Sequence, residues 1–108
     1  MTKVQVFQQE LQDTAVVFKA LGHPARLAIL KYLAETKVCI SGDISDAIPL
    51  SRTTVHQHLT ELKNAGWIKG EISGVKRHYC LNSKNIKKFK SDITDFLTNI
   101  DLFENLNC

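Results

Sequence analysis

A chain of 108 residues, 44% of them apolar and with a formal net charge of +3, is expected to fold as one domain over residues 1–108. It has no apolar run of about 18 residues, which argues against a membrane span. Its first stretch, MTKVQVFQQELQD, is too polar for a signal peptide, and three cysteines at scattered spacings do not form a disulfide framework. We therefore expect a cytoplasmic protein with reduced thiols and no membrane partner.

The charge is distributed unevenly along the chain. Residues 51–90 hold nine Lys or Arg and two Glu, a net of +7, whereas the other 68 residues hold five basic and nine acidic groups, a net of −4. A segment this basic predicts a partner with concentrated negative charge, and nucleic acid is the usual one. The alternative is a solvated face whose composition arose by chance.

The N-terminal third of the chain predicts two helices. Apolar residues spaced by three and four predict a helix over about residues 3–21: Val4, Phe7, Leu11, Phe18 and Leu21. Gly22 ends it, and Pro24 suits the first position of a second helix that runs to about Glu35. The second helix is expected to bury four apolar side chains, Leu27, Ile29, Leu30 and Leu33.

The middle of the chain predicts a helix-turn-helix unit over residues 41–65. After a short strand at residues 37–40, Ser41 is a suitable N-cap for a short helix. Ser51 is the N-cap candidate of the next helix, which runs to residue 64 or 65. The inward stripe of that helix is formed by Val55, Leu59 and Leu62.

Two strands and a long helix complete the chain. The segments 67–72 and 75–81 are predicted strands joined by a hairpin turn, which together give a wing over residues 67–81. The last helix, about residues 84–104, carries an unbroken apolar seam of Ile86, Phe89, Ile93, Phe96, Ile100 and Phe103. This order of elements is that of a winged helix-turn-helix, a mainly α fold with a β wing and long N- and C-terminal helices.

The stretch SRTTVHQHL, residues 51–59, gathers the polar side chains that could carry chemistry. His56 and His58 are two apart on a helix, so they project about 200° apart and do not share a metal ion. The hydroxyls have local capping roles and no oriented base, so an enzyme is not indicated. The stretch instead suits the N-terminal half of a recognition helix. The predicted DNA-contacting residues are Ser51, Arg52, Thr53, Thr54, His56, Gln57 and His58, with Lys69, Lys76 and Arg77 on the wing.

Three segments carry a family resemblance: FKALGHPARLAILKYLAE (18–35), LSRTTVHQHLTELKNAGWIKG (50–70) and GVKRHYCLN (74–82). They resemble the arsenical-repressor (ArsR/SmtB-type) family of bacterial transcription regulators. The resemblance implies a homodimeric repressor that binds double-stranded DNA at an imperfect palindromic operator. It places the dimer interface on the first and last helices, through Val4, Phe7, Leu11, Phe89, Ile93, Phe96, Ile100 and Phe103. Position 56, often serine in the family, is His56 here, whereas His58 matches the family's usual histidine.

Many family members sense metals, and the resemblance places their ligand positions at two points of this chain. One family site uses Cys-x-Cys near the start of the third helix, where this chain has Lys37 and a single Cys39. Another uses carboxylates and histidine on the last helix, and residues 83–108 contain no histidine. Neither ligand set is complete for zinc or a thiophilic ion, so we predict no metal site and no cofactor.

Two alternatives stay open at this point. Cys39, Cys80 and Cys108 are interpreted as small filler or exposed residues; the alternative is a metal- or redox-responsive repressor that uses Cys39, with Cys108 or with an unrecognised site. The alternative of another class is a winged-helix module that binds proteins and not DNA. Such a module is expected to present more aromatic anchors than this basic surface does. The sequence carries no signature of the inducing signal.

Overall fold

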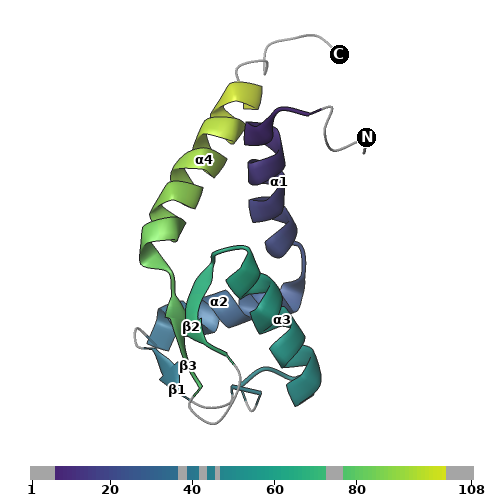
Figure 1. The fold of residues 1–108 in the computed structure, drawn as a ribbon, viewed down its shortest axis with the longest axis vertical. Coiled ribbons are helices and arrows are strands. Elements are labelled where there is room, and N and C mark those ends of the chain that lie inside the picture. The colour runs from purple at the N-terminus through teal and green to yellow at the C-terminus, as the bar shows by residue number, and fades with distance from the viewer. Residues whose placement is uncertain (1–6, 37–38, 42–43, 46, 73–76, 102–108) are drawn as a thin grey trace.

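The computed structural model describes residues 7–36, 39–41, 44–45, 47–72 and 77–101 and has the predicted mainly α, winged helix-turn-helix fold (Figure 1). A compact body is built from two helices and a small sheet. The other two helices, α1 and α4, lie side by side and antiparallel and extend away from that body. The elements in chain order are α1 Gln9–Ala20, α2 Pro24–Thr36, β1 Ile40–Ser41, α3 Arg52–Asn64, β2 Ile68–Glu71, β3 His78–Leu81 and α4 Ser83–Asp101.

The core lies between α2, α3 and the sheet. It contains side chains of the body and of the last turns of α1: Val17, Ala20, Ile29, Leu33, Ile44, Ile48, Val55, Leu59, Leu62, Trp67, Ile68, Ile72 and Tyr79. Trp67, just before β2, packs against Phe89 with ring centroids 4.7 Å apart. This contact fixes the first half of α4 on the body. Aromatic pairs of this kind stabilise a fold by more than the area that they bury alone would give.

The sheet has three antiparallel strands in the order β1-β3-β2. The predicted two-stranded wing is present as β2 and β3, and its turn at residues 73–76 lies outside the described residues. The third strand, β1, pairs Ile40 with Tyr79 and Ser41 with His78. The predicted strand at residues 37–40 is therefore displaced toward the C-terminus, since Cys39 precedes the strand and Ser41 belongs to it.

The predicted short helix that begins at Ser41 is a wrong prediction. Ser41 lies in β1, so it does not cap a helix, and the described residues between 44 and 50 form turns. The amide of Ala47 donates to the carbonyl of Ile44 (2.9 Å), which closes one of these turns. Ile44 and Ile48 are nevertheless buried, so the apolar residues of the segment pack as the pattern predicts although they lie on turns.

Two details of the first helices also differ from prediction. Helix α1 begins at Gln9 and not near residue 3, because Gln8 is extended (ψ 145°) and the carbonyl of Phe7 accepts its hydrogen bond from the side chain of Gln12 (2.7 Å). In α2, Leu27 is exposed although we expected it to be buried. Leu27 is two residues from the buried Ile29, and this spacing puts the two on different sides of a helix.

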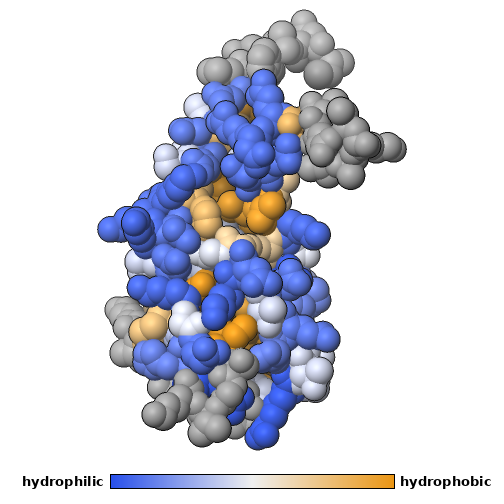
Figure 2. Space-filling view, in the orientation of Figure 1, coloured by the Kyte–Doolittle hydropathy of each residue, from blue (hydrophilic) through white to orange (hydrophobic). Residues whose placement is uncertain are grey.

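No residue of α4, Ser83–Asp101, is buried. Phe96 meets Phe18 of α1 edge to face, with centroids 5.7 Å apart, and both rings remain partly exposed. Figure 2 shows apolar side chains gathered between the two helices and the body, with hydrophilic side chains around them. The exposed large apolar residues of α1, of α4 and of the two residues before α1 are Phe7, Leu11, Val16, Phe18, Phe96, Leu97 and Ile100. In the described part of the chain, no helix has the length and apolar character needed to cross a membrane.

Candidate nucleic-acid interface

Helix α3 starts and ends as the sequence predicts. Ser51 is its N-cap, and its Oγ accepts a hydrogen bond from the amide of Thr54 (3.3 Å) while its hydroxyl donates to Oγ1 of Thr54 (3.0 Å). Such a cap satisfies one of the amides that the first helical turn leaves unpaired. At the other end, Ala65 is the C-cap and Gly66 has a φ of +88°, a conformation that glycine adopts without steric cost. Two predicted DNA contacts, Ser51 and Thr54, thus also hold the helix terminus.

One face of α3 is fixed in the core and the other is exposed. The predicted inward stripe, Val55, Leu59 and Leu62, is buried. Four of the predicted DNA-contacting side chains are exposed on the first two turns: Arg52, Thr53, His56 and Gln57. In Figure 1 the first turn of α3 lies at the same end of the molecule as the far ends of β2 and β3, opposite the chain termini.

His58 was predicted among the DNA-contacting residues, but the structure does not place it on that surface. Only 8% of His58 is exposed, and Nε of Arg26 on α2 donates to its Nδ1 (3.2 Å). The ring of His23 lies beside it, with centroids 4.3 Å apart. Burial lowers the pKa of His58, and the neighbouring His23 and Arg26 lower it further, whereas Glu61 acts in the opposite direction. A neutral His58 therefore joins α3 to α2.

Of the wing residues predicted to contact DNA, Arg77 lies beside α3, whereas Lys69 lines a different crevice with Cys39 and Cys80. Lys69 on β2 is exposed, whereas Arg77, just before β3, is half-buried; Lys76 lies outside the described residues. Arg52 and His56 of α3 and Arg77 line one small crevice, whose apolar side is formed by Val55, Leu59, Ile72 and Tyr79. Nε of Arg77 is buried there and has no hydrogen-bond partner among the described residues. The structure thus brings two sequence-distant groups of predicted contacts together at one place.

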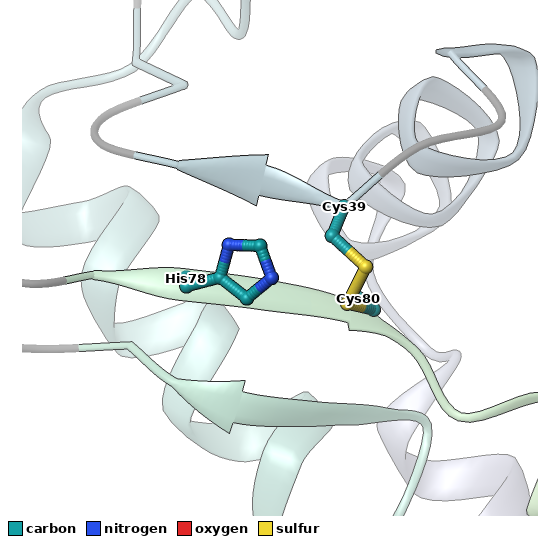
Figure 3. A group of neighbouring side chains, drawn as sticks. All are labelled: Cys39, His78 and Cys80. Carbon is teal, nitrogen blue, oxygen red and sulfur yellow. A yellow bond between two sulfur atoms is a disulfide. The ribbon is translucent and has the colours of Figure 1, made fainter.

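The expectation of three reduced thiols is wrong for two of them. Cys39, just before β1, and Cys80, on β3, form a disulfide across a sequence separation of 41 residues, with their Cα atoms 4.4 Å apart (Figure 3). The antiparallel pairing of β1 with β3 places the two residues opposite each other. Sequence reasoning missed this pairing, because a strand of two residues has too little alternation to reveal its partner. Cys108 lies outside the described residues.

The predicted dimerisation residues fall into three groups. Phe7, Leu11, Phe96 and Ile100 are exposed on the pair formed by α1 and α4 or directly before it. Phe89 and Ile93 are half-buried and pack against the core of the same chain. Val4 and Phe103 lie outside the described residues. The exposed residues Phe7 and Leu11 also line an apolar groove along α1, together with Ala15 and Val16.

The protein-family model described as "Bacterial regulatory protein, arsR family" matches residues 23–69, the stretch from the residue before α2 into β2. An uncharacterized HTH-type transcriptional regulator of Methanocaldococcus jannaschii is 34% identical over 80 residues, which cover 74% of this chain and 90% of that protein. The chain belongs to the ArsR family. As an ArsR-family member it is a DNA-binding transcriptional regulator and not an enzyme.

A second relative and a solved structure are also similar to this chain. The cadmium resistance transcriptional regulatory protein CadC homolog of Staphylococcus aureus is 33% identical over 87 residues, which cover 80% of this chain and 71% of that protein. The crystal structure of an ArsR family transcriptional regulator superposes with a TM-score of 0.71 over 94% of this chain and 100% of that one. At 19% identity, the second match shows that the two ArsR-type chains share the fold.

Proposed function

We propose that this protein is a homodimeric cytoplasmic repressor that binds an imperfect palindromic operator through α3 and the wing. The observation that carries the proposal is the exposed first half of α3, where Arg52, Thr53, His56 and Gln57 stand opposite a face that is locked in the core. The N-terminal part of a recognition helix is the part that meets base edges in the major groove. Because its other face is fixed in the core, α3 can present these side chains in one orientation.

Each exposed residue has a contact suited to its chemistry. Arg52 and Gln57 can make bidentate hydrogen bonds, Arg to guanine and Gln to adenine. Thr53 and the free amides of the first turn suit phosphate oxygens, because the N-terminus of a helix carries a partial positive charge. His56 occupies the position where the family often has serine, and its ring is long enough to change which base edge is met.

The wing would contact the DNA backbone on either side of the bases that α3 meets. Lys69 is exposed on β2, and Arg77 has a buried Nε with no partner among the described residues, beside Arg52 in the same crevice. Lys69 and Arg77 would each neutralise a DNA phosphate, which leaves Arg52 for a base edge. Such contacts position the protein and supply affinity, while the bases supply specificity.

The homodimer is supported by the apolar surface that one chain leaves open. Phe7, Leu11 and Val16 on the α1 side and Phe96, Leu97 and Ile100 on α4 are all at least 37% exposed. Exposed apolar patches of this kind mark an interaction surface. A second copy would cover them and set the two α3 helices about 34 Å apart, one turn of DNA, which suits a palindrome.

The alternative of a protein-binding module has less support. The exposed half of α3 presents a guanidinium, a hydroxyl, an imidazole and an amide, and residues 52–64 contain no Phe, Tyr or Trp. Protein interfaces usually concentrate aromatic anchors.

Selection of bound fragments from genomic DNA tests the proposal directly. We expect fragments that share two inverted half-sites, and a mass in solution of two chains for the free protein. Fragments without any shared motif, or a monomeric free protein, would contradict the proposal. Repeating the selection with Arg52→Ala, against Lys31→Ala on α2 as the charge-matched control, would show whether α3 selects the motif.

A further inference from the structure

Three side chains with soft or imidazole ligand atoms meet on one face of the sheet. The ligand atoms of Cys39, His78 and Cys80 all lie within 4.8 Å of one another. Figure 3 shows the imidazole of His78 beside the two sulfur atoms. Cys39 and His78 are exposed and Cys80 is half-buried, so an ion from solvent can reach the group.

Strand pairing explains why these three residues meet. Ile40 pairs with Tyr79, so the next pair along the two antiparallel strands is Cys39 with Cys80. His78 and Cys80 are two apart on β3 and therefore point to the same face of the sheet, whereas Tyr79 between them points into the core and is 1% exposed. The buried Tyr79 anchors the backbone that carries both β3 ligands.

Strand β2, on the other side of β3, adds charged groups to the same face. Lys69 pairs with Cys80 and Glu71 pairs with His78. A lysine beside a cysteine favours the thiolate, which is the form that binds metals. A carboxylate beside a ligating imidazole is the usual partner that orients it, and it can also serve as a ligand itself.

We propose that, when the Cys39–Cys80 bond is reduced, Cys39, Cys80 and His78 bind a thiophilic divalent cation of the Zn²⁺ or Cd²⁺ type. Two thiolates and one imidazole are the ligands that these ions prefer, and a water molecule or a carboxylate completes four-coordination. The site differs from a Cys-x-Cys site, since Cys39 lies just before β1 and Cys80 lies on β3, 41 residues away. It does not depend on the proposed role in DNA binding.

The disulfide and the metal site exclude each other, because they use the same sulfur atoms. A dithiol reductant converts one state to the other by thiol–disulfide exchange. It gives two electrons and two protons to the Cys39–Cys80 bond, which becomes two thiols, while its own two sulfurs form a disulfide. Binding of the cation then releases the two thiol protons to solvent.

The test is a titration of the full chain with Cd²⁺ alone or Co²⁺ alone, after reduction and removal of the reductant under anaerobic conditions. We expect one ion per chain, with the thiolate-to-metal charge-transfer band, and no band for the oxidised protein. Cys39→Ser and Cys80→Ser should lose the band, and His78→Gln should bind at least about tenfold more weakly.

Matched controls make each outcome decisive. Cys108→Ser removes the third thiol and His56→Gln removes an exposed histidine elsewhere, and both should bind like the unaltered protein. Circular dichroism checks that each variant is folded; Cys39 is exposed, so Cys39→Ser is expected to keep the fold. The proposal is overturned if the reduced protein shows no band, if folded Cys39→Ser keeps full affinity, or if Cys108→Ser loses it.

Discussion

Arg26 on α2 donates a hydrogen bond from Nε to Nδ1 of His58 on α3, across 3.2 Å and 32 positions of sequence. Only a neutral imidazole can accept this bond, because both ring nitrogens of a protonated histidine are donors. The contact therefore links the protonation of one buried ring to the packing of the helix that is proposed to meet DNA. The hydrogen bond between Arg26 and His58 stabilises the packing of α3 on α2 and takes no part in the exposed surface of α3.

This link predicts a pH-dependent stability. Because the pKa of His58 is lowered in the folded protein from its usual 6.5, the unfolded chain binds the proton more tightly. The contribution of His58 is fully present above pH 6.5 and is lost as the pH falls from there through the lowered pKa. We expect the urea concentration at which half of the protein is unfolded to decrease when the pH is lowered from about 7.5 to about 5.5. Carboxylates titrate below this pH range, so they do not account for the decrease.

The groups around His58 define the control for this prediction. His23 faces it from the residue before α2, Arg26 from α2 and Glu61 from α3. His58→Asn keeps an acceptor but has no proton to gain, so its midpoint should change less with pH than that of the unaltered protein. His56→Asn on the exposed face should keep the full change. Equal pH profiles for His58→Asn and the unaltered protein would assign the dependence to another group.

The burial of His58 could have been predicted, whereas the Cys39–Cys80 pair could not. His58 is three residues after Val55 and four before Leu62, so it lies on the same buried stripe of α3. The helix periodicity that identified the stripe already contained this information. Cys39 meets Cys80 only because β1 and β3 pair in one register, and residues 41 positions apart carry no local signal of such a contact.

Local chemistry predicted the helices where capping and packing agree. Helices α2 and α3 match the prediction within a residue or so, because Pro24 and Ser51 mark their starts. Helix α1 begins later than its apolar pattern predicts, since Phe7 continues the spacing but its carbonyl bonds to the side chain of Gln12. The apolar seam of α4 is evident from the sequence, but the sequence does not show that its first half, Ile86 to Ile93, packs on the core of the same chain while Phe96 and Ile100 stay exposed.

The apolar surface of α4 predicts the effect of a buried charge at the proposed dimer interface. Ile100→Glu places a carboxylate where the 55%-exposed Ile100 would be covered by a second copy. We expect the variant to be folded and monomeric at concentrations where the unaltered protein is dimeric, because an unpaired charge is costly to bury. Light scattering after gel filtration measures this. Thr98→Glu, a polar exposed position of α4, should remain dimeric, and a dimeric Ile100→Glu would place the interface elsewhere.

The exposed first turn of α3 predicts a loss of sequence discrimination in Arg52→Ala. Losing a bidentate contact to guanine is expected to cost about 1–3 kcal/mol of specific binding and to relax the preference at one base pair of each half-site. Fluorescence anisotropy with the selected operator and with single-base variants measures both effects. Lys31→Ala on α2 removes the same charge and should leave both unchanged. An equal loss in the two variants would reduce Arg52 to a source of general positive charge.

Lys69 on the wing should behave differently from Arg52, because a phosphate contact carries affinity without sequence information. Lys69→Ala is expected to weaken binding to operator and to unrelated DNA by the same factor. The slope of log affinity against log salt should fall in magnitude by about 1 per chain, since one fewer counterion is released. Anisotropy titrations at several salt concentrations test this, with Lys31→Ala again as the control. A change in the preferred sequence, with an unaltered salt slope, would place Lys69 at a base edge and require the wing to enter a groove.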